Sequence, residues 1–245
     1  MADEGPSCSP PLASSRRAPA GGPTGDRDER RAAVGELGDA LRELLDAAVR
    51  TEVELDGLAA ATAAARALAA DLRRESRELH AVAGVDDPEV GERWYNPVYG
   101  PGNPLAPPLA VTVSADGAVR GRVTLGKPYE GPPGLVHGGF VATLLDHALA
   151  RAARSAGRGG LTASLTVTYR RPVPLCVPLV LEGRLESVEG RRATSHARLT
   201  AEDDPGSTLA EAAGVLVALR AERAAEVFAP TGRAVGAWTS KADDA

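Results

Sequence analysis

One apolar helix, which follows directly on a His-Gly-Gly turn, constrains this chain more than any other feature. Residues 134–150 read GLVHGGFVATLLDHALA. After Gly138 and Gly139 the apolar residues return every three or four positions, which predicts a helix that is buried over most of its surface. The other elements must therefore pack around it. The apolar positions are Phe140, Val141, Leu144, Leu145, Ala148 and Leu149.

The segments on either side of this helix have the period-two pattern of strands. Ahead of it, LAVTV and AVRGRVTLG flank the turn signal Asp116-Gly117 and predict a hairpin. After it come LTASLTVTYRRP, VPLVLEGRLESVEG, RRATSHARLTAE and STLAEAAGVLVALR, a meander of three or four strands. This order predicts an α+β fold in which a single helix covers one face of an antiparallel sheet.

The N-terminal part of the chain differs in composition from this domain. Residues 1–31 are rich in Pro, Gly, Ser and charge, which predicts a disordered tail, because little apolar surface is available to offset the entropy of ordering. Residues 32–82 repeat apolar residues at alternating three- and four-residue steps, which predicts a helical extension. Gly57 is the candidate break between two helices.

Two interpretations of the helical extension stay open: an oligomerising coiled coil, or a helix laid against the main domain. Thr51, Thr62 and Ser76 interrupt the apolar seam, which favours the second. Residues 83–108 are rich in Pro and Gly and predict an ordered connector. We expect the main domain over residues 109–222 and a flexible tail over 223–245.

Composition and motif searches exclude several classes of protein. The formal net charge of −5 gives no basic surplus for nucleic acid. The first thirty residues lack the apolar run of a signal peptide, and no run of about 18 uncharged apolar residues could span a membrane. We therefore expect a cytoplasmic protein. The scattered histidines, the missing Gly-x-Ser-x-Gly elbow and the missing Walker lysine predict no metal, no cofactor and no serine hydrolase.

The start of the apolar helix and its aspartate form a candidate site. The Gly138-Gly139 pair opens the helix without side chains that would block approach, so unpaired N–H groups there could stabilise an oxyanion. Asp146 shares a face with small alanines, which leaves room beside its carboxylate for a base or nucleophile to act. A surface aspartate paired with His147 or Arg151 explains the pattern equally well.

The spacing of these residues has a consequence for assembly. At about 1.5 Å per residue, Gly139 and Asp146 lie roughly 10 Å apart on one helix. A base must come within about 3 Å of the reacting atom or use one bridging water. If both residues act on one substrate, the carboxylate comes from a second subunit, which predicts an obligate dimer.

Several residues together resemble the hotdog-fold acyl-CoA thioesterases of the phenylacetate-pathway type. They are EGPPGLVHGG at 130–139, the aspartate nine residues after His137, Thr162 sixteen residues further on, and the strand ending TYRRPVPL. The resemblance covers roughly residues 96–220. It implies a sheet wrapped around the central helix, two protomers that join their sheets, and a homodimer or a dimer of dimers.

The resemblance also implies roles for individual residues. Gly139 N–H would polarise the thioester carbonyl, and Asp146 of the partner chain would act as general base or nucleophile. Thr162 would hold the carboxylate or a water. His137 would fix the turn and could contact the thioester as a catalytic residue. Some members place an asparagine a few residues before the histidine, where this chain has Gly-Pro-Pro-Gly at 131–134.

The remaining expectations concern the substrate. Arg170 and Arg171 are candidates for coenzyme A phosphates, because guanidinium groups favour bidentate phosphate contacts; solvated arginines at a strand end are the alternative. The sequence thus predicts an acyl-CoA thioesterase that uses water. A non-catalytic acyl-CoA-binding hotdog and an enoyl-CoA hydratase or dehydratase built on His137 and Asp146 stay open as rivals.

Overall fold

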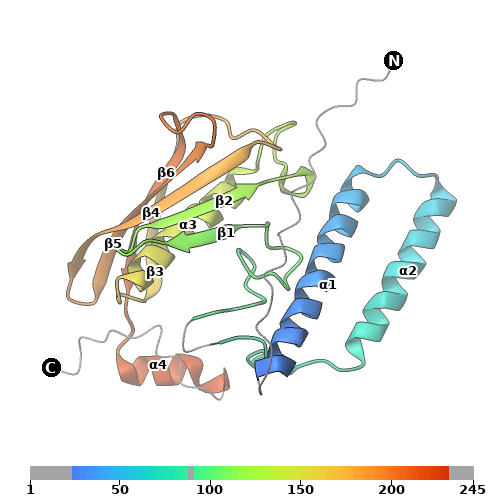
Figure 1. Ribbon diagram of the computed structural model, residues 1–245, viewed down its shortest axis with the longest axis horizontal. Helices are drawn as coiled ribbons and strands as arrows, with labels where there is room; N and C mark the ends of the chain where they lie inside the picture. The colour runs from blue at the N-terminus through green and yellow to red at the C-terminus, as the bar shows by residue number, and fades with distance from the viewer. Residues whose placement is uncertain (1–23, 88–90, 232–245) are drawn as a thin grey trace.

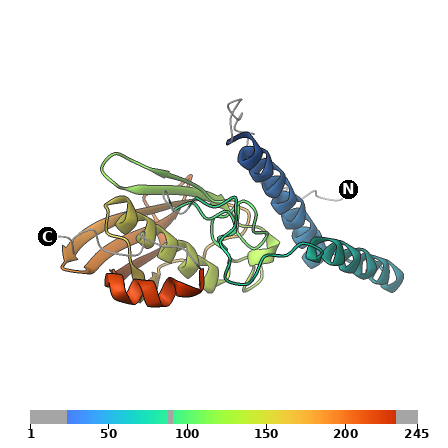
Figure 2. The ribbon, with the colours of Figure 1, turned by 90° about the horizontal axis from the view of Figure 1, so that it is seen from below.

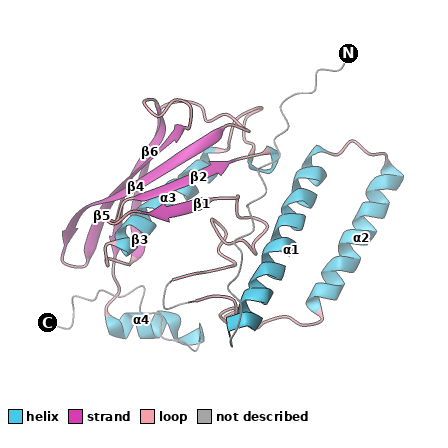
Figure 3. Cartoon of the chain, viewed as in Figure 1, coloured by secondary structure: helices cyan, strands magenta, loops and turns pink. Residues whose placement is uncertain are grey.

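The computed structural model describes residues 24–87 and 91–231 of the chain. Figure 1 and Figure 3 show a curved sheet around one helix at one end of the molecule, and two long helices at the other. The helices are α1 (Thr24–Arg50), α2 (Leu55–Arg73), α3 (Gly138–Ser155) and α4 (Ala221–Phe228), with short 3₁₀ helices η1 (Lys127–Tyr129) and η2 (Ala229–Thr231).

The sheet confirms the α+β prediction. Its six strands are antiparallel and lie in the order β1-β2-β4-β5-β6-β3. The turn between the first two strands is at Asp116-Gly117 as predicted, where Gly117 has φ 82°. The strands are β1 (Ala110–Val113), β2 (Val119–Thr124), β3 (Leu161–Tyr169), β4 (Pro178–Glu189), β5 (Arg192–Ala201) and β6 (Thr208–Val217).

Helix α3 is the centre of the core, as its apolar pattern predicts. Two glycines let the sheet approach it closely. A Cβ at Gly183 of β4 would lie 2.7 Å from the carbonyl oxygen of Ala148, and one at Gly214 of β6 would lie 2.8 Å from Cδ1 of Leu149. The sheet therefore wraps the helix at a distance that larger residues would not allow. The α3 residues buried there are Val141, Leu144, Leu145, Ala148, Leu149, Ala152 and Ala153.

Strand β3 lies at the edge of the sheet and pairs only with β6. Six of its nine residues are exposed. Ala163 is an extra residue in the ladder, because Thr162 pairs with Leu216 and Ser164 with Val215. Such a bulge shifts the alternation of side chains by one position. A long, unpaired edge of this kind is a ready surface for another strand.

The N-terminal helices differ from the expectation in their bounds and packing. Helix α1 begins at Thr24, inside the segment expected to be a tail, and residues 1–23 lie outside the described chain. The break between the helices is at residues 51–54, so the prediction of a break at Gly57 is wrong; that glycine lies in the first turn of α2. Helix α2 has no buried residue. The packed-helix interpretation thus fits α1 but not α2.

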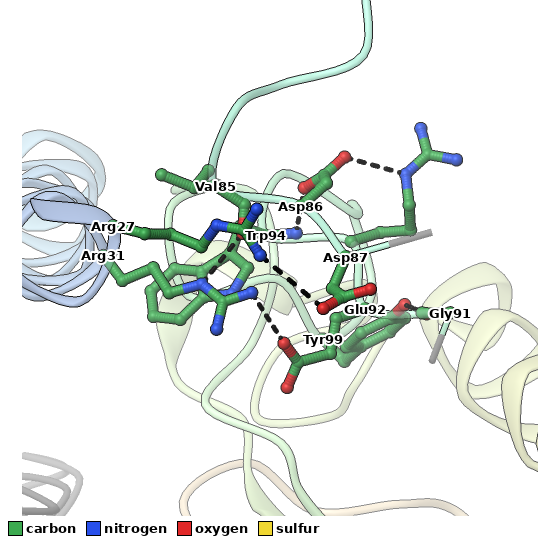
Figure 4. Close-up of polar contacts among 10 residues, drawn as sticks. Arg27, Arg31, Val85, Asp86, Asp87, Gly91, Glu92, Trp94 and Tyr99 are labelled. Carbon is green, nitrogen blue, oxygen red and sulfur yellow. Dashed lines mark hydrogen bonds and ion pairs between the residues drawn. The ribbon is translucent and has the colours of Figure 1, made fainter. Parts of the chain in front are cut away.

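Helix α1 is held on the connector by arginines, as Figure 4 shows. Nε of Arg31 donates to the carbonyl oxygen of Val85 at 2.9 Å, its guanidinium also contacts Glu92 at 2.9 Å, and it lies over the ring of Trp94. The connector itself is tied together by the buried carboxylate of Asp86, which accepts from the backbone N–H of Trp94 at 2.7 Å. These contacts tie the described parts of the connector to one another and to α1.

The C-terminal segment was expected to be a flexible tail from residue 223. Residues 221–231 instead form α4 and η2, and Ala224 packs into the interior. The short amphipathic run that makes this helix lacks a capping hydrogen bond and was too brief to be read from the sequence. Residues 232–245 lie outside the described chain.

The connector also packs against the middle of α3. The ring of Tyr99 lies on that of His147, with centroids 4.7 Å apart. Burial, and then the positive charges of Arg151 and Arg154, lower the pKa of His147 from its usual 6.5 to about 4. A neutral imidazole is therefore favoured in the folded chain.

We predict that stability falls as the pH drops from 6.5 to 4, because the unfolded chain binds a proton at this residue that the folded chain does not. The pKa shift corresponds to about 3 kcal/mol for a fully buried ring, and to about 2 kcal/mol for the partly exposed ring seen here. Denaturant unfolding at pH 7 and pH 4 measures the effect. His147→Gln should lose this part of the pH dependence, whereas His80→Gln, at an exposed position, should keep it; equal slopes would contradict the account.

Candidate functional site

The first turn of α3 is closed by its own N-cap residue. Nδ1 of His137 accepts from the N–H of Gly139 at 2.9 Å, and the carbonyl oxygen of His137 accepts from Phe140 at 2.9 Å. The N–H of Gly138 has no hydrogen-bond partner among the described residues. His137 thus caps the first turn of α3. The open donor is the N–H of Gly138, whereas the N–H of Gly139, which was expected to polarise the carbonyl, is bonded to the cap.

The loop before His137 leaves no room for a side chain at Gly131. A Cβ at Gly131 would lie 2.8 Å from Cα of His137 and 3.1 Å from its Cβ. No side chain fits at that position without moving the backbone of the residue that caps α3. The loop is closed by its own hydrogen bonds instead: Gly131 donates to the carbonyl oxygen of Leu135 at 2.9 Å, and Gly134 donates to Glu130 at 2.8 Å.

A pocket of about 360 Å³ opens beside this turn. The hydroxyl of Tyr169, the last residue of β3, donates to the carbonyl oxygen of Gly138 at 2.9 Å. A Cβ added to Gly138 would lie 3.4 Å from the Tyr169 ring. The ring therefore forms one wall of the pocket, next to the open N–H. Sequence reasoning missed Tyr169, although it directly precedes the arginine pair. The pocket is lined by Pro132, Leu135, Val136, Gly138, Val141, Tyr169, Arg170, Arg171, Pro172 and Val173.

The structure brings Asp146 and Thr162 together. Oγ1 of Thr162 donates to Oδ1 of Asp146 at 2.9 Å, which joins α3 to the first residues of β3. Leu165 and Val167 pack on the core, and uninterrupted alternation would turn Thr162 to the other face of the strand. The bulge at Ala163 reverses this, so the hydroxyl reaches the helix. The alternative pairing of Asp146 with His147 or Arg151 is not present.

The two halves of the candidate site stay apart within one chain. Asp146 is eight residues after Gly138 on a continuous helix, which puts them about 12 Å apart at 1.5 Å per residue. The carboxylate therefore cannot reach a carbonyl held at Gly138 of the same chain. Asp146 and Thr162 lie near the start of the exposed edge strand, where a second chain could approach them.

The two candidate arginines differ in their surroundings. Nε of Arg170 donates to Oε1 of Glu211 at 3.0 Å on the neighbouring strand, so its charge is already paired. Arg171 is exposed and has no ion-pair partner among the described residues. Both line the pocket, but only Arg171 has a full set of donors to offer a ligand.

No three histidine, cysteine, aspartate or glutamate side chains within residues 24–87 and 91–231 are placed to hold a metal ion together. None of the helices described here is both long and apolar enough to cross a membrane. The candidate site is thus the turn of α3, the pocket and the Asp146–Thr162 pair.

Comparison with known proteins gives the family. The family model described as thioesterase superfamily matches residues 133–208. A thioesterase superfamily protein of known crystal structure is 39% identical, with a TM-score of 0.68, over 75% of this chain and 94% of that one. The chain belongs to the thioesterase superfamily. Its sheet wrapped around α3 is the hotdog fold that the family resemblance implied.

Curated relatives match a shorter segment. Acyl-coenzyme A thioesterase THEM4 of Xenopus laevis is 38% identical over 78 residues, which is 31% of this chain and 35% of that protein. THEM4 of Bos taurus is 36% identical over 99 residues, 40% of each chain. The matching segments thus span between about a third and two fifths of these relatives.

We predict that Gly131→Ala destabilises the protein by about 1–3 kcal/mol, because the new methyl group would displace the backbone of His137. Denaturant unfolding measures the loss. The control is Gly84→Ala, where an added Cβ meets no atom within 4 Å. A Gly131 variant as stable as this control would mean that the loop does not constrain the cap.

Proposed function

We propose that this chain hydrolyses acyl-CoA thioesters to a carboxylic acid and free coenzyme A. The observation that carries the proposal is the Asp146–Thr162 pair on a helix whose first turn keeps an open N–H, in a member of the thioesterase superfamily. Curated relatives that share the segment are named acyl-coenzyme A thioesterases. No resident metal or redox cofactor enters the proposed reaction.

The proposed chemistry follows from the positions of donor and base. The thioester carbonyl oxygen sits at the N–H of Gly138, which stabilises the negative charge that develops there. The carboxylate of Asp146 takes a proton from water while the water oxygen bonds to the carbonyl carbon. The tetrahedral intermediate collapses, the carbon–sulfur bond breaks, and the coenzyme A thiolate leaves and takes up a proton. Direct attack by the carboxylate, followed by hydrolysis of the anhydride, uses the same geometry.

The proposed site is built from two chains. Gly138 comes from one protomer and the Asp146–Thr162 pair from its partner, since the two are too far apart on one helix. The exposed edge of β3 supports this arrangement, because joining two such edges would extend the sheet and satisfy both rows of backbone groups. A homodimer is thus the smallest active unit, and a monomer with full activity would contradict it.

Coenzyme A binding is proposed for the pocket side of the site. Arg171 is the better of the two arginines for a phosphate, because Glu211 already neutralises Arg170. Tyr169 positions the turn through its bond to Gly138. The phenylacetate-pathway subtype and a cytoplasmic location stay predictions from the sequence.

We predict that Asp146→Asn lowers kcat for acyl-CoA hydrolysis by about 10²–10⁴-fold, because the amide cannot accept the proton. Thr162→Val keeps the shape of the side chain but removes one hydrogen bond to a charged group, which should cost about tenfold to a hundredfold. Release of free thiol from short, medium, long and aryl acyl-CoA esters measures both.

The control for these variants is Thr112→Val, which removes an exposed threonine hydroxyl from β1, at the opposite edge of the sheet from β3. It should hydrolyse like the wild type. Binding of acyl-CoA without thiol release in the wild type would favour the sensor, and a change in enoyl absorbance would favour the hydratase. Unchanged turnover in Asp146→Asn would contradict the proposed mechanism.

A further inference from the structure

Helix α2 presents an apolar face that nothing in the described chain covers. All of its residues are exposed apart from the partly exposed Ala69. Leu58 and Leu72 are 42% and 48% exposed. Together with Ala65 they follow one another at seven-residue steps, and Thr62 and Ala69 lie between them on the same side. These positions have the heptad spacing of a coiled-coil seam, with Thr62 as its one polar member.

Helix α1 has a second apolar face besides the one on the connector. Leu37 and Leu44 are 38% and 50% exposed and are seven residues apart. Ala40 and Ala47, also exposed, fall between and after them at the same spacing. The side of α1 that faces the connector is formed by other residues, among them Arg31. Both helices of the hairpin thus carry an open seam of leucine and alanine.

The residues beside the two seams carry opposite charges, negative on α1 and positive on α2. Glu36 and Glu43 directly precede the exposed leucines of α1, and Arg66 and Arg73 directly follow the seam positions 65 and 72 of α2. All four are exposed, and none has an ion-pair partner among the described residues. Each pair is spaced by seven residues, as in the flanking positions that select partners in coiled coils.

We propose that the α1–α2 hairpin docks on the same hairpin of a second copy, with α1 of each copy against α2 of the other. The glutamates of α1 come directly before seam residues, and the arginines of α2 come directly after them. Flanking positions of these two kinds face each other when the two helices are parallel. Within one chain α1 and α2 are antiparallel (Figure 1), so the parallel pairing needs a second chain. A twofold axis across the bundle makes α1 parallel to the partner's α2, and the same surface is used by both copies.

This contact is separate from the β3 edge. In Figure 1 and Figure 2 the hairpin projects from the connector, away from the sheet. Docked hairpins would therefore join two sheet-linked dimers into a dimer of dimers. The contact buries leucines that are otherwise in water, which supplies the driving force. It does not depend on the proposed hydrolysis.

Charge reversal tests the pairing. The first variant carries Glu36→Lys and Glu43→Lys, and the second carries Arg66→Glu and Arg73→Glu. Each alone places like charges across both contacts of the bundle, so its mass by analytical ultracentrifugation should be half that of the wild type. When the two variants are co-expressed, opposite charges face each other again, and the wild-type mass should return.

A matched control and the alternatives complete the test. Glu75→Lys with Glu78→Lys reverses two exposed glutamates just beyond α2 and should leave the mass unchanged. A second pair, Leu58→Glu with Leu72→Glu, should also halve the mass. Equal masses for the wild type and the charge variants would overturn the proposal. So would co-expressed variants that stay at half mass, because opposite charges on two different chains would then fail to restore the contact.

Discussion

The packing of α3 into the curve of the sheet is the contact on which the rest of the structure depends. It is set by the apolar face of the helix and by Gly183 and Gly214, which bring the backbone of two strands against it. One face of α3 is buried against the sheet, whereas Gly139, Thr143 and Asp146 lie on a side that is at least partly exposed. The same packing that forms the core therefore selects where chemistry can occur.

A straight buried helix also separates the two parts of the site. The open N–H of Gly138 is at one end of a turn capped by His137, and the Asp146–Thr162 hydrogen bond lies two turns further on. In the proposed reaction a second chain, joined at the exposed β3 edge, brings the two parts together. The proposed assembly and the proposed catalysis then follow from one geometric constraint, and the hairpin of α1 and α2 is proposed as a second surface for joining copies.

The elements with strong periodicity could be predicted, while local backbone geometry could not. The pattern of α3, the Asp116-Gly117 turn and the strand meander were all readable, and the pairing of Thr162 with Asp146 was suggested by family resemblance. The bulge at Ala163, which turns Thr162 inward, has no sequence signal. The capture of the Gly139 N–H by His137 and the bond from Tyr169 to Gly138 likewise depend on tertiary placement that no periodicity reveals.

The most direct test of the two-chain site is complementation between inactive variants. Gly138→Pro removes the proposed oxyanion donor at the first helical position, where proline is tolerated, and His137 already has the extended backbone that precedes proline. Co-expressed with Asp146→Asn, it should form mixed dimers in which one site has both groups intact, which restores about a quarter of wild-type thiol release. No recovery in mixed dimers of confirmed composition would show that Gly138 and Asp146 do not act together across the interface.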